Sequence, residues 1–379
     1  MAKAVVLAGG GARGSYHIGA WQALIELGYK PDIVTGTSVG SLNGVLMALD
    51  WFDVAKGMWL SIDDRDVMDI PEKVFSKETL TFARDFATKG GISLEPLEKM
   101  ITRFVDEDML RASKCRYGLV TVNVNTHKPA EVTLEEIPHG KLIDYMLASS
   151  ACFPVLRSRK IDGQMYIDGG YYANMPSNLA VRMGADEIVE IDLDSFGVSR
   201  KLKAENVKVI SVKSWHDLGG FLDFDPQNAK RNIELGYLDT YKAFGKLEGK
   251  AYAFRIGEIE KMYTAFGVQF MELCEQMYET HSALRVAAEV YMRAERRNPK
   301  TVGDKFIAVL EGAMAEAKLP LGEVYTMENL VPLLKSARAN SVLENAQQLL
   351  KDSPLAKIAA SVAAADIKQA YLALIKTLL

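Results

Sequence analysis

A short apolar run followed directly by glycines constrains the fold of this chain more than any other feature of the sequence. Residues 4–8 (AVVLA) precede GGGARG at 9–14, and a helical pattern begins near Ser15. A continuous apolar run of this length predicts a strand buried on both faces, as in a parallel sheet. The glycines allow unusual backbone conformations and let a ligand reach the N–H groups. The opening therefore predicts a strand–loop–helix unit whose loop can hold a phosphate or an oxyanion.

The same alternation of strand and helix continues through the first two thirds of the chain. Strand patterns recur at 32–36, 117–124, 130–134, 164–168, 187–192 and 207–212, and helical patterns follow at 40–48, 140–151 and 179–184. Such alternation predicts an α/β fold in three layers, with a mainly parallel sheet flanked by helices.

A charged, mostly helical stretch interrupts this alternation at 51–112. Its apolar residues nearest the second strand are Trp51, Phe52, Met58, Trp59 and Leu60. We expect them either to cover a cleft at the end of the sheet or to belong to the core.

The pattern changes again near residue 256. From 256 to 379 there is no convincing strand, apolar residues keep helical spacing from Phe266 to Tyr291, and helical segments follow at 303–318, 326–338, 340–351 and 355–377. The sequence therefore predicts two domains, an α/β domain over 1–255 and a helical domain over 256–379. The helical faces are expected to bury against one another, with peripheral membrane contact as the alternative.

Charge and cysteine content exclude several classes of protein. The net charge is −4, with 45 basic and 49 acidic residues, which argues against a nucleic-acid binder or a polybasic membrane patch. Cys115, Cys152 and Cys274 are too widely spaced for a disulfide framework or a zinc site, and no other metal motif is present. No apolar run is long enough for a signal peptide or a spanning helix, so a cytoplasmic location is expected.

The second strand runs into Gly36-Thr37-Ser38-Val39-Gly40, a GxSxG motif. A serine on a sharp strand-to-helix turn projects its hydroxyl into a cleft, and small residues two positions away on each side relieve the crowding that this turn creates. The motif predicts a nucleophile elbow with Ser38 as the nucleophile. The alternative is a glycine-rich turn without chemistry.

A carboxylate follows the strand at 164–168. Asp168 is succeeded by Gly169 and Gly170, which allow the chain to turn sharply. If this strand is parallel to its neighbours, Asp168 lies where α/β sheets bind ligands. An Asp-Gly pair by itself is usually only a turn.

A serine hydroxyl needs a base, and histidine is the usual one. In the order typical of α/β-hydrolases the histidine follows the acid, which leaves His216 and His281. His281 lies on the apolar face of a helical pattern, and His17 lies in the first turn of the first helix. A Ser38–Asp–His216 triad remains open on spacing alone, although a surface or packing role for His17 and His216 is favoured.

The glycines at 9, 11 and 14 also match the GxGxxG of dinucleotide-binding folds. That interpretation requires an acidic residue at the end of the second strand. Here that strand ends at the GxSxG motif, and Asp32 stands at its beginning. A dinucleotide-binding protein therefore stays as an alternative, as does a catalytically inert scaffold whose C-terminal helices bind a partner.

Taken together, the motifs resemble the patatin-like phospholipase family. The family pattern is a glycine-rich loop, then a GxSxG, then a DGG or DGA, and this sequence has GGGARG at 9–14, GTSVG at 36–40 and DGG at 168–170. ASSACFP at 148–154 and Asn174 and Pro176 after the acid add to the resemblance, which covers roughly residues 3–215.

The resemblance implies a serine lipid acyl hydrolase, of the phospholipase A or lysophospholipase type, with a Ser38–Asp168 dyad and no catalytic histidine, metal or cofactor. It implies an oxyanion hole at Gly9, Gly10, Gly11, Arg13 and Gly14, in which the amides of Gly10 and Gly11 hold the oxyanion and the charge of Arg13 assists. The implied substrate is a phospholipid or another acyl-ester lipid, which allows peripheral contact with a membrane. Headgroup preference and oligomeric state do not follow from the sequence.

Overall fold

The computed structural model describes residues 1–70, 90–265 and 302–339 of the chain. It divides into two compact units, Met1–Phe244 and Gly245–Leu379. The expected helical segments at 340–351 and 355–377, and the stretch from Phe266 to Tyr291 that contains Cys274 and His281, lie outside the described residues.

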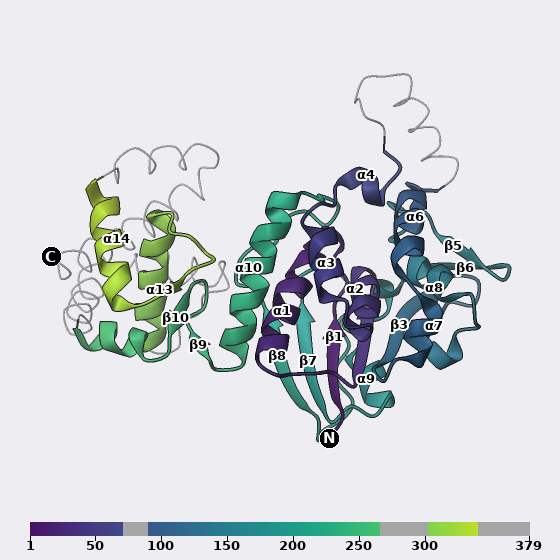
Figure 1. Ribbon diagram of the computed structural model, residues 1–379, viewed down its shortest axis with the longest axis horizontal. Helices are drawn as coiled ribbons and strands as arrows, with labels where there is room; N and C mark the ends of the chain where they lie inside the picture. The colour runs from purple at the N-terminus through teal and green to yellow at the C-terminus, as the bar shows by residue number, and fades with distance from the viewer. Residues whose placement is uncertain (71–89, 266–301, 340–379) are drawn as a thin grey trace, which may run out of the picture. The chain divides into compact units, whose positions relative to one another are not determined.

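The first unit is built on one mixed sheet with a mainly parallel core (Figure 1). The strand order is β5-β6-β3-β2-β1-β7-β8, and β4 pairs with β3. The central neighbours β3, β2, β1, β7 and β8 are parallel, whereas β4 and β6 run antiparallel to β3 and β5 runs antiparallel to β6. The strands are β1 Lys3–Leu7, β2 Ile33–Thr37, β3 Arg116–Asn123, β4 Lys128–Thr133, β5 Arg159–Ile161, β6 Gln164–Asp168, β7 Glu187–Asp192 and β8 Lys208–Lys213.

Helices cover both faces of the sheet. The α9 helix packs its Leu179 and Ala180 on Ala4, Val6 and Ile33 of one face. On the other face α2 and α8 form a second apolar cluster with β3. The helices of this unit are α1 Ser15–Glu26, α2 Val39–Ala48, α3 Phe52–Trp59, α4 Asp64–Val67, α6 Glu95–Phe104, α7 Glu107–Ala112, α8 Leu142–Ser149, α9 Ser177–Arg182 and α10 Pro226–Ala243. The α/β class and the layered, mainly parallel sheet are thus confirmed.

The helices α1 and α10 lie side by side and approach very closely (Figure 1). A Cβ atom on Gly236 would lie 2.1 Å from the carbonyl oxygen of Tyr16, and one on Gly19 would lie 1.8 Å from that of Ile233. The backbones therefore touch where both helices carry glycine.

Replacing Gly236 with alanine is expected to lower the free energy of unfolding by about 1–3 kcal/mol, because the added methyl group forces the two helices apart. Gly57 of α3 gives the matched control, since a Cβ there meets no atom within 4 Å. Gly57→Ala should raise stability by about 0.5–1 kcal/mol, since alanine is the better helix former. Urea unfolding of both variants measures the difference, and equal effects would contradict the close packing.

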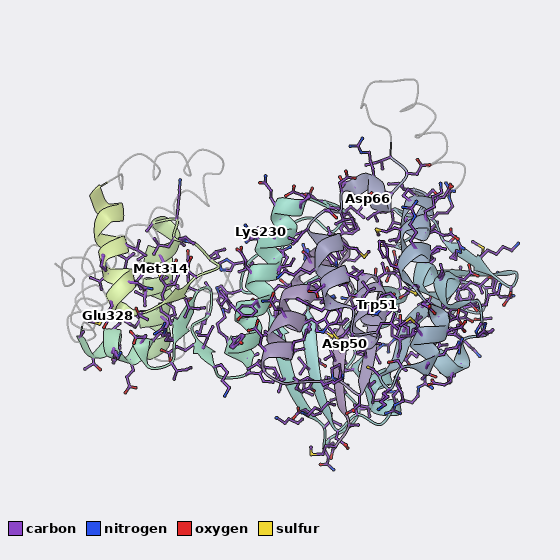
Figure 2. The ribbon with its side chains drawn as sticks, viewed as in Figure 1. Asp50, Trp51, Asp66, Lys230, Met314 and Glu328 are labelled. Carbon is purple, nitrogen blue, oxygen red and sulfur yellow. The ribbon has the colours of Figure 1, made fainter. Side chains whose placement is uncertain are left out.

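The second unit has a small core of its own. Strands β9 Leu247–Glu248, β10 Ala253–Arg255 and β11 Val324–Tyr325 form a short sheet beside α13 Val302–Glu316 and α14 Met327–Ala339. Phe254 and Met314 are fully buried in its core, and Figure 2 labels Met314. The prediction of no strand beyond residue 256 is wrong at β11, because a strand of two residues is too short to show a periodic pattern. The unit also begins before residue 256, since β9 and β10 belong to it.

Candidate active site

The Ser38 turn has the strained backbone that a nucleophile elbow requires. Ser38 lies between β2 and α2 with φ 55° and ψ −129°, a region that residues with a side chain avoid. A Cβ on Gly36 would lie 2.1 Å from the carbonyl oxygen of Gly40, and one on Gly40 would lie 2.2 Å from that of Leu7. Both glycines of the motif are therefore required by close backbone contacts, while Thr37 and Val39 flank the serine.

A second serine holds this turn against the sheet. The N–H of Ser38 donates to Ser149 Oγ at 2.9 Å, and that hydroxyl donates to the carbonyl oxygen of Val120 in β3 at 2.7 Å. Ser149 is fully buried at the end of α8. The sequence places it in the ASSACFP stretch but gives no sign of this role.

Asp168 lies at the end of β6, and this strand is antiparallel to β3, which corrects the expectation of a parallel strand. β6 pairs with β3 in the register that sets Asp168 opposite Thr121, and Thr37 at the end of β2 is opposite the adjacent Val120. Because β4 occupies the other edge of β3, β2 and β6 lie end to end along the same edge. This register brings Asp168 beside Ser38 even though the two strands run in opposite directions.

Asp168 is buried, with 6% of its surface exposed. It accepts a hydrogen bond from the N–H of Gly170 at 2.7 Å. Burial raises the pKa of Asp168 to about 6, against the opposing effects of the hydrogen bonds from Gly170 and the Ser38 hydroxyl. The neighbouring Gly169 has no space for a side chain, since a Cβ there would lie 2.1 Å from the carbonyl oxygen of Val120. A carboxylate with this pKa can take and return a proton near neutral pH.

The glycine loop borders the same site. A Cβ on Gly9 would lie 3.2 Å from the Cβ of Ser38 and 2.4 Å from Asn174 Oδ1. Asn174 donates from Nδ2 to the carbonyl oxygen of Gly9 at 3.2 Å, which fixes the loop to the segment after the acid. Within the described ranges, the N–H groups of Gly10 and Gly11 have no hydrogen-bond acceptor. Two backbone donors are thus available next to the serine.

Arg13 does not face this site, which corrects the expectation that its charge helps to hold an oxyanion. Its Nε donates to the carbonyl oxygen of Gly219 at 2.7 Å, and Nη1 donates to that of Asp194 at 2.6 Å. The side chain is absent from the cavity wall described next. Gly14 also lies outside that wall, packed against Val39 and Trp59. Arg13 therefore connects the glycine loop to the segments that contain Asp194 and Gly219.

An apolar cavity of about 200 Å³ opens beside Ser38 and Asp168. Part of its wall comes from the stretch at 51–112, as one of the two sequence interpretations expected. Of the five apolar residues expected there, Met58 and Trp59 line the cavity, whereas Phe52 packs edge-on against Trp21 and Leu60 is exposed. The α6 helix and its flanks add Leu94, Leu97, Met100, Ile101, Phe104 and Val105. The neighbouring α4 helix, on which Figure 2 labels Asp66, begins with a capping box between Asp63 and Asp66. Such a wall suits a hydrocarbon chain.

A buried polar network lies behind the cavity and was missed from the sequence. Trp59 Nε1 donates to Asn43 Oδ1 at 2.9 Å, and Asn43 Nδ2 donates to the carbonyl oxygen of Gly14 at 2.9 Å. His17 Nδ1 lies 3.2 Å from the same Nδ2. Burial lowers the pKa of His17 to about 3, so its imidazole stays neutral and serves packing. The network joins the glycine loop, α2 and α3.

No other titrating base adjoins Ser38 in the described part of the chain. His17, His127, His139 and His216 are the histidines of that part, and none lines the cavity. The described part of the chain contains no cluster of His, Cys, Asp or Glu that could hold a metal ion. None of the helices described is both long and apolar enough to span a bilayer.

The known proteins to which this chain is similar carry related names. Residues 5–181 match the family described as patatin-like phospholipase. The proteins named patatin-like phospholipase domain-containing protein 6 of Mus musculus and Homo sapiens are each 30% identical over 211 residues, which cover 51% of this chain and 13% of theirs. Lysophospholipase NTE1 of Mycosarcoma maydis is 29% identical over 207 residues, which cover 52% of this chain and 10% of the relative.

These relatives are therefore much longer than the stretch they share with this chain. Among solved structures, VipD from Legionella pneumophila aligns over 100% of this chain and 91% of its own, at a TM-score of 0.37 and 13% identity. That similarity is too low to support an argument about function.

Proposed function

We propose that the protein hydrolyses fatty acyl esters of phospholipids or lysophospholipids, from the premise that residues 5–181 match the patatin-like phospholipase family. Ser38 is the nucleophile in this proposal and Asp168 is its base. The relatives named phospholipase and lysophospholipase support the substrate class.

In the first half of the reaction, Asp168 accepts the proton of the Ser38 hydroxyl as Oγ bonds to the ester carbonyl carbon. The carbonyl oxygen becomes an oxyanion that receives hydrogen bonds from the N–H groups of Gly10 and Gly11. Asp168 then gives its proton to the departing alcohol oxygen as the ester bond breaks. An acyl group is left on Ser38.

In the second half, Asp168 takes a proton from water while the water oxygen bonds to the acyl carbon. Ser38 Oγ leaves with the proton that Asp168 returns, and a fatty acid is released. The cavity wall from α3 and α6 holds the hydrocarbon chain during both halves, because apolar surface is removed from water there.

The observation that carries the proposal is that Ser38 and a buried carboxylate of raised pKa, Asp168, line one cavity to which no described histidine contributes. A Ser38–Asp–His216 triad finds no support in this arrangement. The dinucleotide alternative is disfavoured for a related reason, since β2 leads to Ser38 where that fold needs an acidic residue.

A fluorophosphonate probe tests the proposal directly, because it forms a covalent bond only with an activated serine. We expect one equivalent of label on Ser38, located by mass spectrometry of the digested protein. Ser150 also lines the cavity and provides the control. Labelling should persist in Ser150→Ala and vanish in Ser38→Ala. A chain that takes no label at Ser38 would support the inert scaffold instead.

A further inference from the structure

We propose that the protein docks on an anionic lipid surface through the loop between β7 and β8, at residues 195–203. This inference rests on the proposed function, because it names the surface from which the lipid enters the same cavity.

Four exposed apolar side chains lie at the cavity or next to residues that line it. They are Phe196 at 63% exposure, Tyr171 at 45%, Phe153 at 42% and Val198 at 39%, and we call them the rim. Phe196, Val198 and Tyr171 also line the cavity itself. Phe153 adjoins them, since its carbonyl oxygen accepts a hydrogen bond from the Tyr171 hydroxyl. The rim is thus the outer end of the apolar wall that begins beside Ser38.

The rim is held in place by contacts to the catalytic motifs. The N–H of Val198 donates to the carbonyl oxygen of Gly170 at 2.8 Å, and its own carbonyl oxygen accepts from the N–H of Asn174 at 3.0 Å. Ser195 Oγ donates to the carbonyl oxygen of Gly9. The ring of Phe196 packs edge-on against Phe221 with centroids 5.2 Å apart. The exposed rings are therefore fixed in position over the site.

The charge of this loop matches an anionic surface. Residues 195–203 read SFGVSRKLK, with three cations at Arg200, Lys201 and Lys203, and the two acidic residues of the β7–β8 loop, Asp194 and Glu205, lie on either side of this stretch. Arg200 lies over the ring of Tyr172 at 4.1 Å and donates to its carbonyl oxygen at 2.9 Å, directly after the rim residue Tyr171. Asn178 holds the backbone at Lys201 and Lys203 through both ends of its amide. Apolar side chains beside fixed cations are the two features that bind peripheral proteins to anionic lipid.

The continuity with the cavity favours lipid over a protein partner as the occupant. A rim that leads into an acyl-sized apolar wall lets a lipid chain pass from a bilayer to Ser38 without crossing water. Each apolar atom that leaves the bilayer then meets another apolar atom, so extraction costs little.

The test measures binding to vesicles in a Ser38→Ala background, so that no lipid is consumed. Co-sedimentation is carried out with vesicles of phosphatidylcholine alone and of phosphatidylcholine mixed with phosphatidylglycerol. Phe196→Ser/Val198→Ser should lower the partition coefficient about tenfold on both kinds of vesicle, because two apolar groups lose burial. Lys201→Ala/Lys203→Ala should lower it about tenfold or more on mixed vesicles alone, since the attraction is to anionic headgroups.

Met109→Ser is the matched control, since Met109 on α7 is 48% exposed and lies outside the cavity wall. Its binding should equal that of the parent, and thermal unfolding of all variants verifies that they fold. The proposal is overturned if the parent binds neither vesicle or if the rim variant binds as well as the parent. Fluorophosphonate labelling of the native chain keeps the two questions apart, because a protein that is labelled at Ser38 yet ignores vesicles retains the proposed function and loses the docking surface.

Discussion

Replacing Ser38 with alanine is expected to lower fatty acid release from phospholipid vesicles by at least about a thousandfold, because no other group can carry the acyl intermediate. Alanine keeps the Cβ that the turn already accommodates, so the loss reports the hydroxyl alone. Free fatty acid is measured over time with the purified chain and its variant.

The exposed serine at the end of α3 provides the comparison for this experiment. Ser61 Oγ donates only to nearby helix carbonyls, those of Gly57 at 3.0 Å and Met58 at 3.2 Å. Ser61→Ala should release fatty acid at the parent rate. Substantial release by Ser38→Ala would mean that another residue is the nucleophile.

Asp168→Asn is expected to lose activity by at least about a thousandfold, because an amide cannot take the serine proton. The same substitution should raise the free energy of unfolding at pH 7 by about 1–3 kcal/mol, since it removes a charge whose burial raises its pKa. The amide oxygen can still accept from the N–H of Gly170. Urea unfolding and turnover of a soluble ester give the two readouts, and a fall in both would indicate a merely structural acid.

The pH dependence follows from the same carboxyl group. Its pKa of about 6 in the folded protein lies above the ordinary value of 3.8 for an aspartate, so the folded state holds an extra proton between these two pKa values. The contribution of this group to stability is present at low pH and is lost as the pH rises toward about 6. The kcat/KM should change in the opposite sense, rising about tenfold per pH unit up to about pH 6 and then levelling. His216→Ala should keep this profile, whereas a triad through His216 would lose it.

The sequence marks the residues of the candidate site, but it does not predict how the fold brings them together. The three motifs mark Ser38, Asp168 and the glycine loop because each imposes a local backbone requirement that short spacing can reveal. The direction of β6 could not be predicted, since strand sense depends on its pairing with Thr121 and Val122 of β3, far away in the chain.

The orientation of the Arg13 side chain could not be predicted from the sequence either, because it depends on residues far away in the chain. Its partners at Asp194 and Gly219 are separated from it by 181 and 206 positions. Local pattern cannot reveal such contacts. The α10 helix is a different case, because Asp225 and Pro226 form a recognisable helix start, with the Asp225 carboxylate accepting from the N–H of Asn228 at 2.7 Å. That signal was available and was missed.

The buried hydroxyl of Ser149 connects the nucleophile turn to the backbone of β3, and Asp168 pairs with the same strand. The proposed reacting groups are therefore held by the sheet, whereas α3 and α6 contribute part of the apolar cavity wall. Substitutions that lengthen, shorten or bend the acyl pocket can accumulate on those helices without moving the serine or its base. This separation allows the lipid preference to change during evolution while the proposed nucleophile and base stay in place.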